Sequence, residues 1–305
     1  ADSLLAMWQQ AVADSGERPA FTCLGQTLSY AEIDQLGERI AGYFHTQLGL
    51  AAGDRLAIQL PNLLQYPIVV IAAWKLGLVI VNTNPMYTHR ELVHQFNDSG
   101  AKTVVVLDQF YDTLQAALPE TGIEHVVVTR AIDLLPQPKK TLLTAVTKVL
   151  GKRPSLPAQG IISFTDMLAG QSAYPSHTPA YDDISALQYT GGTTGVSKGV
   201  MLTQGSLMSN VAQTLAMVSA GGRSVKYFTT VSPLPLYHIY AWMLNMGLMP
   251  ATRGHSVLIP DPRNIPMFVG AIKSLKFEIF CGLNSLFVAL LQDSKFQKLD
   301  FSKLQ

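Results

Sequence analysis

The residues best suited to chemistry lie in one segment, residues 189–203, which reads Tyr-Thr-Gly-Gly-Thr-Thr-Gly-Val-Ser-Lys-Gly-Val-Met-Leu-Thr. Glycine lets backbone N–H groups approach a ligand closely, in conformations that other residues avoid. Hydroxyl groups and a lysine add donors and a positive charge, and this combination is suited to phosphate oxygens. We therefore predict a phosphate-binding segment that uses Thr190, Gly191, Gly192, Thr193, Thr194, Gly195, Ser197 and Lys198.

Three rival motifs can be compared with this segment. A Walker A loop is excluded because Lys198 follows Ser197 and not a glycine, and no G-x-G-x-x-G fingerprint occurs. Residues 195–199 do fit G-x-S-x-G, in which the serine stands between a strand and a helix. We expect the strand to end at Tyr189, the helix to begin after Thr203, and a long flexible loop to connect them. A serine hydrolase built on Ser197 is therefore the less favoured alternative.

The elements that must position this segment alternate between helix and strand signals. Capping boxes at 29–32 and 88–91 begin two of the helices. Such alternation predicts parallel sheets covered by helices. We expect strands at 20–24, 26–28, 55–60, 79–82, 103–107, 125–129, 184–189, 228–231, 257–259 and 278–281, and helices at 4–12, 33–40, 65–76, 88–99, 207–218 and 284–292.

Composition limits the classes of protein that fit. The chain has 305 residues, of which 48% are hydrophobic and 14% charged, so a large buried core is expected. A net charge of +1 without a dense basic run argues against a nucleic-acid partner. Cys23 and Cys281 fit no metal or redox spacing, and we expect two free, buried thiols in a reducing cytoplasm. The most apolar stretch, residues 67–81, is too short to span a bilayer.

The least regular part, residues 131–183, is rich in proline and contains one candidate amphipathic helix. Its apolar residues are flanked by basic ones over residues 139–153. Two hypotheses fit this pattern: contact with an anionic membrane surface, or a solvated surface helix. The apolar residues are Leu142, Leu143, Val146 and Leu150, and the basic residues are Lys139, Lys140, Lys148, Lys152 and Arg153.

Several segments together resemble the adenylate-forming, AMP-binding acyl-CoA synthetase superfamily. Residues 189–203 resemble its phosphate-binding signature, and Leu-Pro-Leu-Tyr-His at 234–238 is similar to its acyl-pocket box. Segments 82–88 and 97–102 are most similar to bacterial long-chain fatty acid–CoA ligases. Gln204 stands where the family usually has a histidine.

The resemblance implies an α/β fold, the large N-terminal domain of these enzymes. In that domain two similar subdomains, each built on mainly parallel sheets layered with helices, would hold residues 50–205 and residues 1–49 plus 206–305. The family's later Tyr-Gly-x-Thr-Glu box, its ribose-binding Asp, its hinge and its small C-terminal domain with a catalytic lysine have no counterpart in residues 1–305. We therefore expect the chain to be the N-terminal part of a longer enzyme and not competent alone for the full reaction.

The resemblance also implies the reaction. A fatty acid would react with ATP to give an acyl-adenylate and pyrophosphate, and coenzyme A would then take the acyl group as a thioester. Lys198 would contact the β- and γ-phosphates, and Mg²⁺ would bridge the phosphates, with Thr194 as a candidate ligand. Tyr237 and His238 would line the acyl pocket, with His238 near the carboxylate, while Trp242 could line it or pack in the core.

Other hypotheses stay open. The substrate could be an aryl, short-chain or amino acid, and the chain could be a non-catalytic nucleotide-binding module. We expect a cytoplasmic protein, with contact to the inner membrane face and oligomerisation left open.

Overall fold

The computed structural model describes residues 1–149, 156–157, 159–170, 173–191, 196–220 and 226–304, with side chains undescribed at 146–149. The chain forms two compact units. Unit 1 comprises Ala1–Ile33, Pro61–Leu64 and Ser206–Gln305, and unit 2 comprises Asp34–Leu60 and Gln65–Gly205. Residues 34–49 thus group with the unit that carries the phosphate-binding segment, and the family-based subdomain boundaries stay a prediction.

Unit 2 is built on a seven-stranded sheet with the order β7-β6-β5-β3-β4-β8-β9. Its neighbouring strands are parallel except for the antiparallel pair β8 and β9. The strands are β3 (Arg55–Gln59), β4 (Val79–Asn82), β5 (Thr103–Leu107), β6 (His125–Thr129), β7 (Ile162–Ser163), β8 (Ile184–Thr190) and β9 (Lys198–Thr203).

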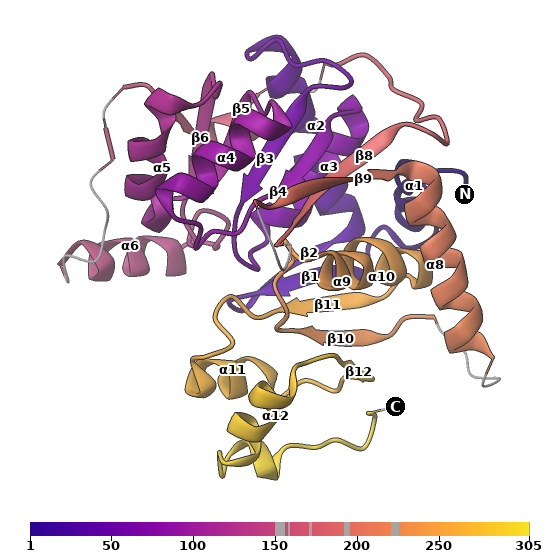
Figure 1. The fold of residues 1–305 in the computed structure, drawn as a ribbon. Helices are drawn as coiled ribbons and strands as arrows, with labels where there is room; N and C mark the ends of the chain where they lie inside the picture. The colour runs from indigo at the N-terminus through magenta and orange to yellow at the C-terminus, as the bar shows by residue number, and fades with distance from the viewer. Residues whose placement is uncertain (150–155, 158, 171–172, 192–195, 221–225, 305) are drawn as a thin grey trace. The chain divides into compact units, whose positions relative to one another are not determined.

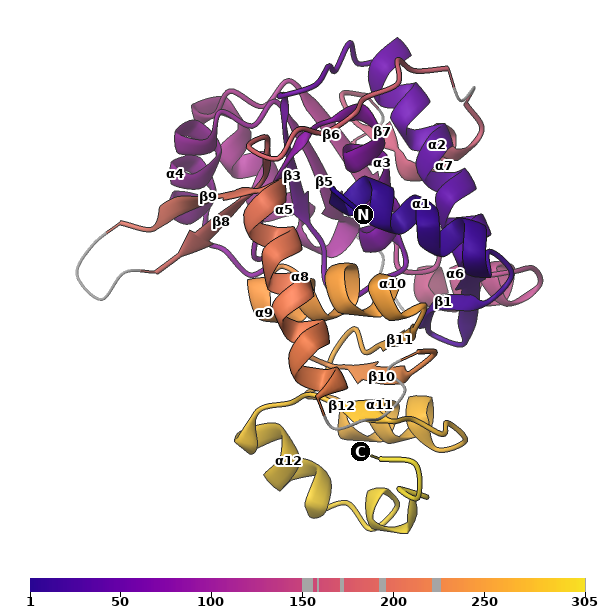
Figure 2. The same cartoon turned by 90° about the vertical axis from the view of Figure 1, so that its right-hand side faces the viewer.

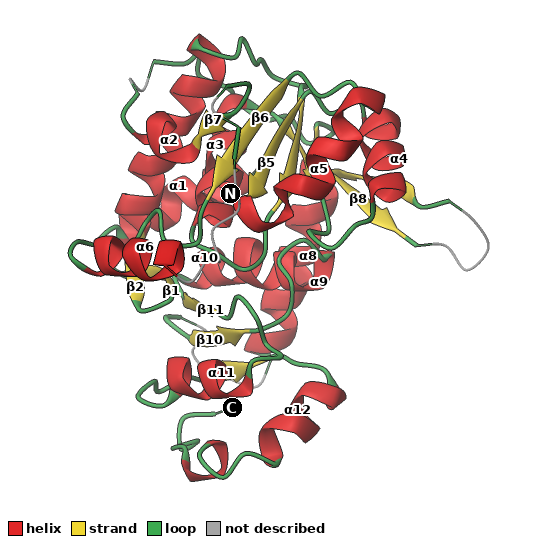
Figure 3. Ribbon diagram, turned by 90° about the vertical axis from the view of Figure 1, so that its left-hand side faces the viewer, coloured by secondary structure: helices red, strands yellow, loops and turns green. Residues whose placement is uncertain are grey.

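Helices cover both faces of this sheet, which explains why its central strands contain runs of consecutive apolar residues. All five residues of β5 are buried, as a strand between two helical layers requires. Helices α2 and α3 lie on one face and α4 and α5 on the other (Figure 3). The helices are α2 (Tyr30–Thr46), α3 (Gln65–Leu76), α4 (His89–Ser99), α5 (Tyr111–Ala117), α6 (Lys139–Val149) and α7 (Phe164–Leu168), with short 3-10 turns η1 (Asp108–Phe110) and η2 (Leu118–Glu120).

Local sequence signals set both ends of α4, a helix that contacts the residues next to Thr190 and Lys198. The capping box of Thr88 and Glu91 is formed as predicted. Gly100 ends the helix with a left-handed φ of 65°, a conformation that costs glycine little. Both ends of α4 are therefore fixed by residues that the sequence already identified.

Unit 1 contains a five-stranded sheet with the order β12-β10-β11-β1-β2. Strands β1 and β2 form an antiparallel hairpin that turns at Leu24 and Gly25, both with positive φ, and the other pairs are parallel. Its elements are α1 (Leu4–Ser15), β1 (Pro19–Cys23), β2 (Gln26–Ser29), α8 (Gln204–Ser219), β10 (Thr229–Ser232), α9 (Ile239–Trp242), a π-helical turn η3 (Met243–Leu248), α10 (Met249–Thr252), β11 (His255–Leu258), α11 (Ile265–Ile272), β12 (Ile279–Phe280), α12 (Asn284–Leu291) and η4 (Phe296–Lys298). The first two residues of α8 belong to unit 2.

Alternation along β10 separates the two faces of this sheet. Val231 belongs to an apolar cluster with Phe268 of α11 and Leu290 of α12. The next residue, Ser232, points the other way and donates a hydrogen bond of 2.6 Å to Asn245 in η3. Figure 1 shows α11 and α12 together beside the sheet in the yellow part of the chain. One face thus carries α11 and α12, and the other carries η3.

The structure corrects two expectations. The long loop predicted up to Thr203 is wrong, because Lys198–Thr203 form β9 and pair with β8 (Figure 2). Cys23 is buried as expected, but Cys281 is only partly buried. The other predicted strands and helices are present with ends shifted by a few residues, whereas the prediction did not include β7, α5, α7, α9, η3, α10, α11 or the short 3-10 turns. Among the described residues, no helix has the length and apolar character needed to cross a membrane.

Candidate functional site

The predicted phosphate-binding segment lies where strands β8 and β9 of the hairpin meet their connecting loop. Thr190 and Lys198 are register partners in the antiparallel ladder. Such partners project on the same face, with Cβ atoms about 4.5–5.5 Å apart. Both side chains are exposed, so an ammonium group and a hydroxyl group point to one side of the hairpin.

The residues between these partners are only partly described. Gly191 is exposed and Ser197 half-buried, so both can be reached by a ligand. Gly192, Thr193, Thr194 and Gly195 lie outside the described residues. Lys198 takes part in none of the ion pairs found in the described part of the chain. Among the described residues, the ammonium group of Lys198 beside the connecting loop is therefore available to an anion.

A buried polar network connects β8 to the neighbouring strand β4 and to helix α3. Tyr66 donates a hydrogen bond of 2.5 Å to Oδ1 of Asn82, whose Nδ2 donates to Oε1 of Gln188 at 3.0 Å. Burial raises the pKa of Tyr66 well above its ordinary value, so the phenol stays protonated and acts as a donor. Buried networks of this kind favour one arrangement of the strand that carries them.

Close packing fixes the start of β9 against β8. A Cβ atom added at Gly199 would lie 2.9 Å from Cε2 of the Tyr189 ring, which is too close for a real contact. Glycine at this position is therefore required by the approach of the ring, and not by the backbone conformation. The sequence singled out Gly199 only as part of the glycine-rich segment.

Ser197 is not arranged as a hydrolase nucleophile. It precedes strand β9, whereas a nucleophile elbow leads from a strand into a helix. The imidazole of His94 contacts the backbone carbonyl of Ser197 at 2.7 Å and is thereby engaged away from the hydroxyl. A general base must reach the proton that it removes. The serine hydrolase alternative is accordingly not supported by the geometry.

Asn62 determines the course of the segment that leads to His238. Its Nδ2 donates to the carbonyls of Ser232 and Leu234 at 3.0 and 2.9 Å, and its Oδ1 accepts from Leu236 N at 2.8 Å. Asn62 is 3% exposed, so these bonds are protected from water. No local pattern in the sequence indicates this role, because Asn62 is 170 residues away from its first partner.

Tyr237 and His238 follow this anchored segment. Their rings are tilted against each other with centroids 4.7 Å apart. His238 is exposed, yet partial desolvation of its ring lowers its pKa below the usual value, so it is neutral at pH 7. Trp242 lies one helical turn later and is fully buried.

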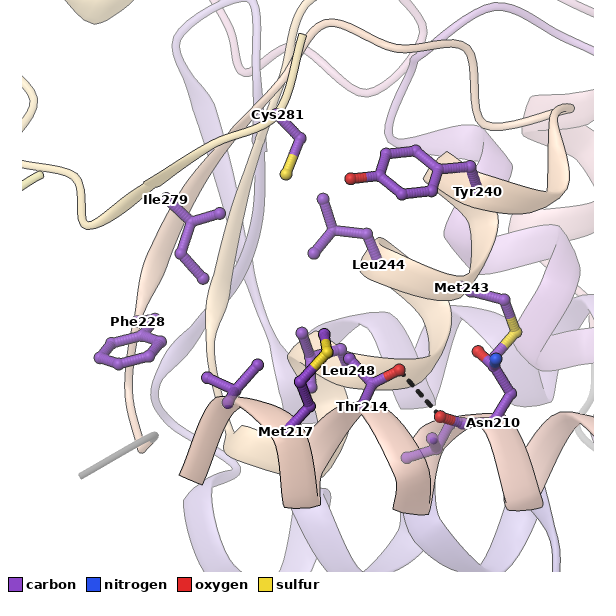
Figure 4. Close-up of a pocket in the computed structure, with 12 residues that line it drawn as sticks. Asn210, Thr214, Met217, Phe228, Tyr240, Met243, Leu244, Leu248, Ile279 and Cys281 are labelled. Atoms are coloured by element: carbon purple, nitrogen blue, oxygen red, sulfur yellow. Dashed lines mark hydrogen bonds between the residues drawn. The ribbon is translucent and has the colours of Figure 1, made fainter. Parts of the chain in front are cut away.

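Unit 1 also contains an apolar pocket of about 520 Å³ (Figure 4). Tyr240, Met243 and Leu244 contribute to its wall, but Tyr237, His238 and Trp242 do not. The pocket is lined by Asn210, Val211, Thr214, Met217, Val218, Phe228, Tyr240, Met243, Leu244, Leu248, Ile279 and Cys281.

Two of the polar groups in this wall, the hydroxyls of Thr214 and Tyr240, are already engaged. The Thr214 hydroxyl donates to the backbone carbonyl of Asn210 at 2.8 Å. A hydrogen bond with Cys281 is the main cause that raises the pKa of Tyr240, and Figure 4 shows the two groups facing each other. Apart from the Asn210 amide, the remaining surface is aliphatic, aromatic or thioether, which suits an apolar ligand.

A metal site cannot be assembled from the described residues. They contain no group of three or more His, Cys, Asp or Glu side chains that could hold an ion. Thr194, the candidate magnesium ligand, lies outside them. Magnesium often needs only one or two protein ligands beside substrate phosphates, so we assign no step to it from these residues.

Comparison with known proteins identifies the family. Residues 8–305 match the AMP-binding enzyme family. The chain is 39% identical to a long-chain-fatty-acid–CoA ligase of Escherichia coli O157:H7, over 99% of this chain and 54% of that protein. It thus spans about half the length of the relatives it matches.

Solved structures agree on the fold. A long-chain-fatty-acid–CoA ligase from Archaeoglobus fulgidus superimposes with a TM-score of 0.79 and 26% identity, covering 99% of this chain and 56% of that one. The anthranilate CoA ligase AuaEII in complex with anthranoyl-AMP gives a TM-score of 0.80 at 16% identity, over 99% and 54%. Because the family match covers nearly all of the sequence, the chain belongs to the AMP-binding enzyme family.

Proposed function

We propose that this chain is part of a long-chain fatty acid–CoA ligase, which uses ATP to convert a fatty acid to its acyl-adenylate and then to a coenzyme A thioester. The pairing of Lys198 with Thr190 beside the connecting loop of the hairpin carries the proposal, because it offers a cation and a hydroxyl to one anionic ligand. The identity of 39% to a ligase of that name supports the fatty acid as substrate.

The first step needs no general base. A carboxylic acid with a pKa near 4 is already ionised at neutral pH. One of its oxygens would form a bond to the α-phosphorus of ATP, and pyrophosphate would leave with the electron pair of the broken P–O bond. The barrier comes from bringing two anions together, so positioning and electrostatic stabilisation matter most.

Lys198 would supply much of that stabilisation. Its ammonium group is a compact point charge with three donors, suited to the β- and γ-phosphates of the leaving pyrophosphate. The hydroxyl of Thr190 would donate on the same face of the hairpin. ATP and coenzyme A are the proposed co-substrates, with Mg²⁺ bound to the phosphates.

The apolar pocket of unit 1 is the proposed site for the acyl chain. Its volume of about 520 Å³ is within the range of small-molecule sites. Tyr237 and His238 remain proposed as contacts near the carboxylate, with His238 as a neutral donor. Trp242 is fully buried, which favours its role in packing.

Other carboxylates are the second candidate. The fold is shared with an anthranilate ligase, so an aryl acid is compatible with it. A non-catalytic nucleotide-binding module is the candidate from another class. We also propose a cytoplasmic location. Contact of α6 with an anionic membrane surface rests on Leu142, which is 65% exposed beside Lys139.

The experiment is carboxylate-dependent ATP–pyrophosphate exchange by the intact protein, with acids from acetate to stearate, benzoate and several amino acids. A maximum at long chains supports the fatty acid proposal. A maximum at another acid replaces the substrate and keeps the adenylation chemistry. No exchange with any acid contradicts the proposed reaction.

A further inference from the structure

We propose that two side chains of α4, His94 and Asp98, hold the two strands of the β8–β9 hairpin beside their connecting loop and thereby position Thr190 and Lys198 for ATP. We call this pair the α4 clamp. The expected effect of the clamp on ATP binding rests on the proposed function. The contacts that form the clamp lie within unit 2 and do not depend on that function.

Asp98 holds the end of β8. The hydroxyl of Tyr189 donates to Oδ2 of Asp98 at 2.6 Å. Hydrogen bonds from a hydroxyl to a carboxylate are short and about twice as strong as neutral ones. Tyr189 is 6% exposed, whereas Asp98 is exposed, so the bond joins a buried ring to a carboxylate at the surface. The residue directly before Thr190 is thus tied to the helix.

His94 holds the start of β9. Its Nε2 lies 2.7 Å from the backbone oxygen of Ser197. A carbonyl oxygen can only accept, so Nε2 must carry the proton, as it does in the Nε2–H tautomer and in the imidazolium ion. The residue directly before Lys198 is thus tied to the same helix.

The spacing of the clamp suits this double contact. Residues 94 and 98 are four apart and share one face of α4. The rings of His94 and Tyr189 also meet edge to face, with centroids 6.4 Å apart. One helical face therefore reaches both strands of the hairpin.

The helix that carries the clamp is itself well fixed. Leu92 and Phe96 of α4 are fully buried in the apolar cluster below the sheet. Gln95, also fully buried, donates to the backbone oxygen of Asn82 in β4 at 3.1 Å. Contacts to α4 therefore connect the hairpin to the rigid part of the sheet.

Strand pairing alone would hold the hairpin less firmly. Strand β9 is at the edge of the sheet and pairs only with β8. Its Val200 and Met201 are 46% and 66% exposed, so they add little burial. Ends of ladders with few buried contacts open most easily. The clamp supplies the contacts that the edge strand lacks.

The test compares His94→Ala with His89→Ala in the intact protein. His89 is on the same helix, is partly exposed and contacts Glu120 at 3.0 Å, so it is a matched control. We expect His94→Ala to raise the KM for ATP about tenfold in ATP–pyrophosphate exchange, with the KM for the acid unchanged. His94→Gln, which keeps a side-chain donor, should recover part of the loss, and His89→Ala should behave as wild type.

A second measurement does not depend on activity. Amide hydrogen exchange at residues 197–199 should be faster in His94→Ala than in His89→Ala. Tyr189→Phe removes only the hydroxyl bonded to Asp98, and it should make amide hydrogen exchange faster at residues 189–191. This variant replaces His94→Ala in the test if His94→Ala fails to fold.

The outcomes separate the two proposals. If wild type shows no pyrophosphate exchange, the proposed function fails, and the amide exchange rates alone decide on the clamp. If wild type is active and a folded His94→Ala keeps its KM for ATP, the clamp is overturned. Unchanged amide exchange in both variants would overturn it as well.

Discussion

Lys198 lies directly opposite Thr190 in the antiparallel pairing of β8 and β9. The ladder therefore fixes the separation of the two Cβ atoms and places the ammonium and hydroxyl groups on one face, since register partners share a face. Eight positions separate the two residues in sequence, so a loop without the ladder would leave that separation undefined. The pairing turns a glycine-rich segment into a site with a defined entrance.

Removing the charge at this entrance should affect chemistry more than folding. We expect Lys198→Ala to slow adenylate formation by a factor of about 10² or more, because the leaving pyrophosphate loses a preorganised cation. The measurement is pyrophosphate exchange at saturating ATP and acid. Lys102→Ala, which removes an exposed lysine 4.0 Å from Glu124, is the control and should be silent. A rate within twofold of wild type would rule out this role for Lys198.

Adding one methyl group at Gly199 should weaken the hairpin. In Gly199→Ala the new Cβ would lie 2.9 Å from the Tyr189 ring, whose hydroxyl is held by Asp98. The ring cannot move without breaking that bond, so we expect a loss of about 1–3 kcal/mol, typical of overpacking. Urea unfolding measures the loss. Gly122→Ala, where a Cβ meets nothing within 4 Å, should leave stability nearly unchanged. Equal stability of the two variants would contradict the packing argument.

Most of the unit 2 sheet could be predicted from the sequence because its central strands are buried on both faces. Runs such as residues 104–107 are apolar throughout, and the structure confirms the strand predicted over 103–107 at both ends. Strand β9 was missed for the opposite reason. It is an edge strand whose Val200 and Met201 face solvent, so no burial pattern marked it.

Only the contiguous part of the candidate site could be predicted from the sequence. The phosphate-binding segment is contiguous, so its residue types were visible together. The apolar pocket gathers residues from α8, Phe228, η3 and Cys281, and nothing local in the sequence links them. The support from His94 and Asp98 was invisible too, because their partners are about 90 to 100 residues away.

A bulky side chain inside the apolar pocket should discriminate between acids by length. We expect Thr214→Phe to fill part of the pocket and to lower kcat/KM for stearate about tenfold or more, with little change for acetate. Gln213→Phe places the same ring at an exposed position next to it that does not line the pocket. Pyrophosphate exchange with both acids measures the ratio. An equal fall in kcat/KM for both acids in Thr214→Phe would show that this pocket does not hold the acyl chain.

Asn62 should be important for stability. In Asn62→Ala the amide N–H of Leu236 and the carbonyls of Ser232 and Leu234 lose their buried partner. Each unsatisfied buried group costs about 1–3 kcal/mol, so we expect a loss of at least roughly 2 kcal/mol in urea unfolding. Asn97→Ala is the control, since Asn97 is exposed and makes one side-chain bond, to Glu120 O at 2.8 Å. A loss no larger than that of the control would contradict the anchoring role.

The imidazole of His255 should make the protein less stable in acid. Burial lowers its pKa from 6.5 to about 4, and its Nε2 lies 2.7 Å from the Thr22 hydroxyl. Between pH 6.5 and 4 the unfolded chain binds this proton more readily than the folded chain, so stability rises with pH in that window. The contribution is fully present above pH 6.5 and is lost as pH falls toward 4. At one pKa unit per about 1.4 kcal/mol, the loss by pH 4 is roughly 3 kcal/mol. Urea unfolding of wild type and His255→Gln at several pH values tests this. The variant should show a flatter slope between pH 4 and 6.5, whatever its stability at pH 7, and parallel curves would show that His255 does not titrate in this way.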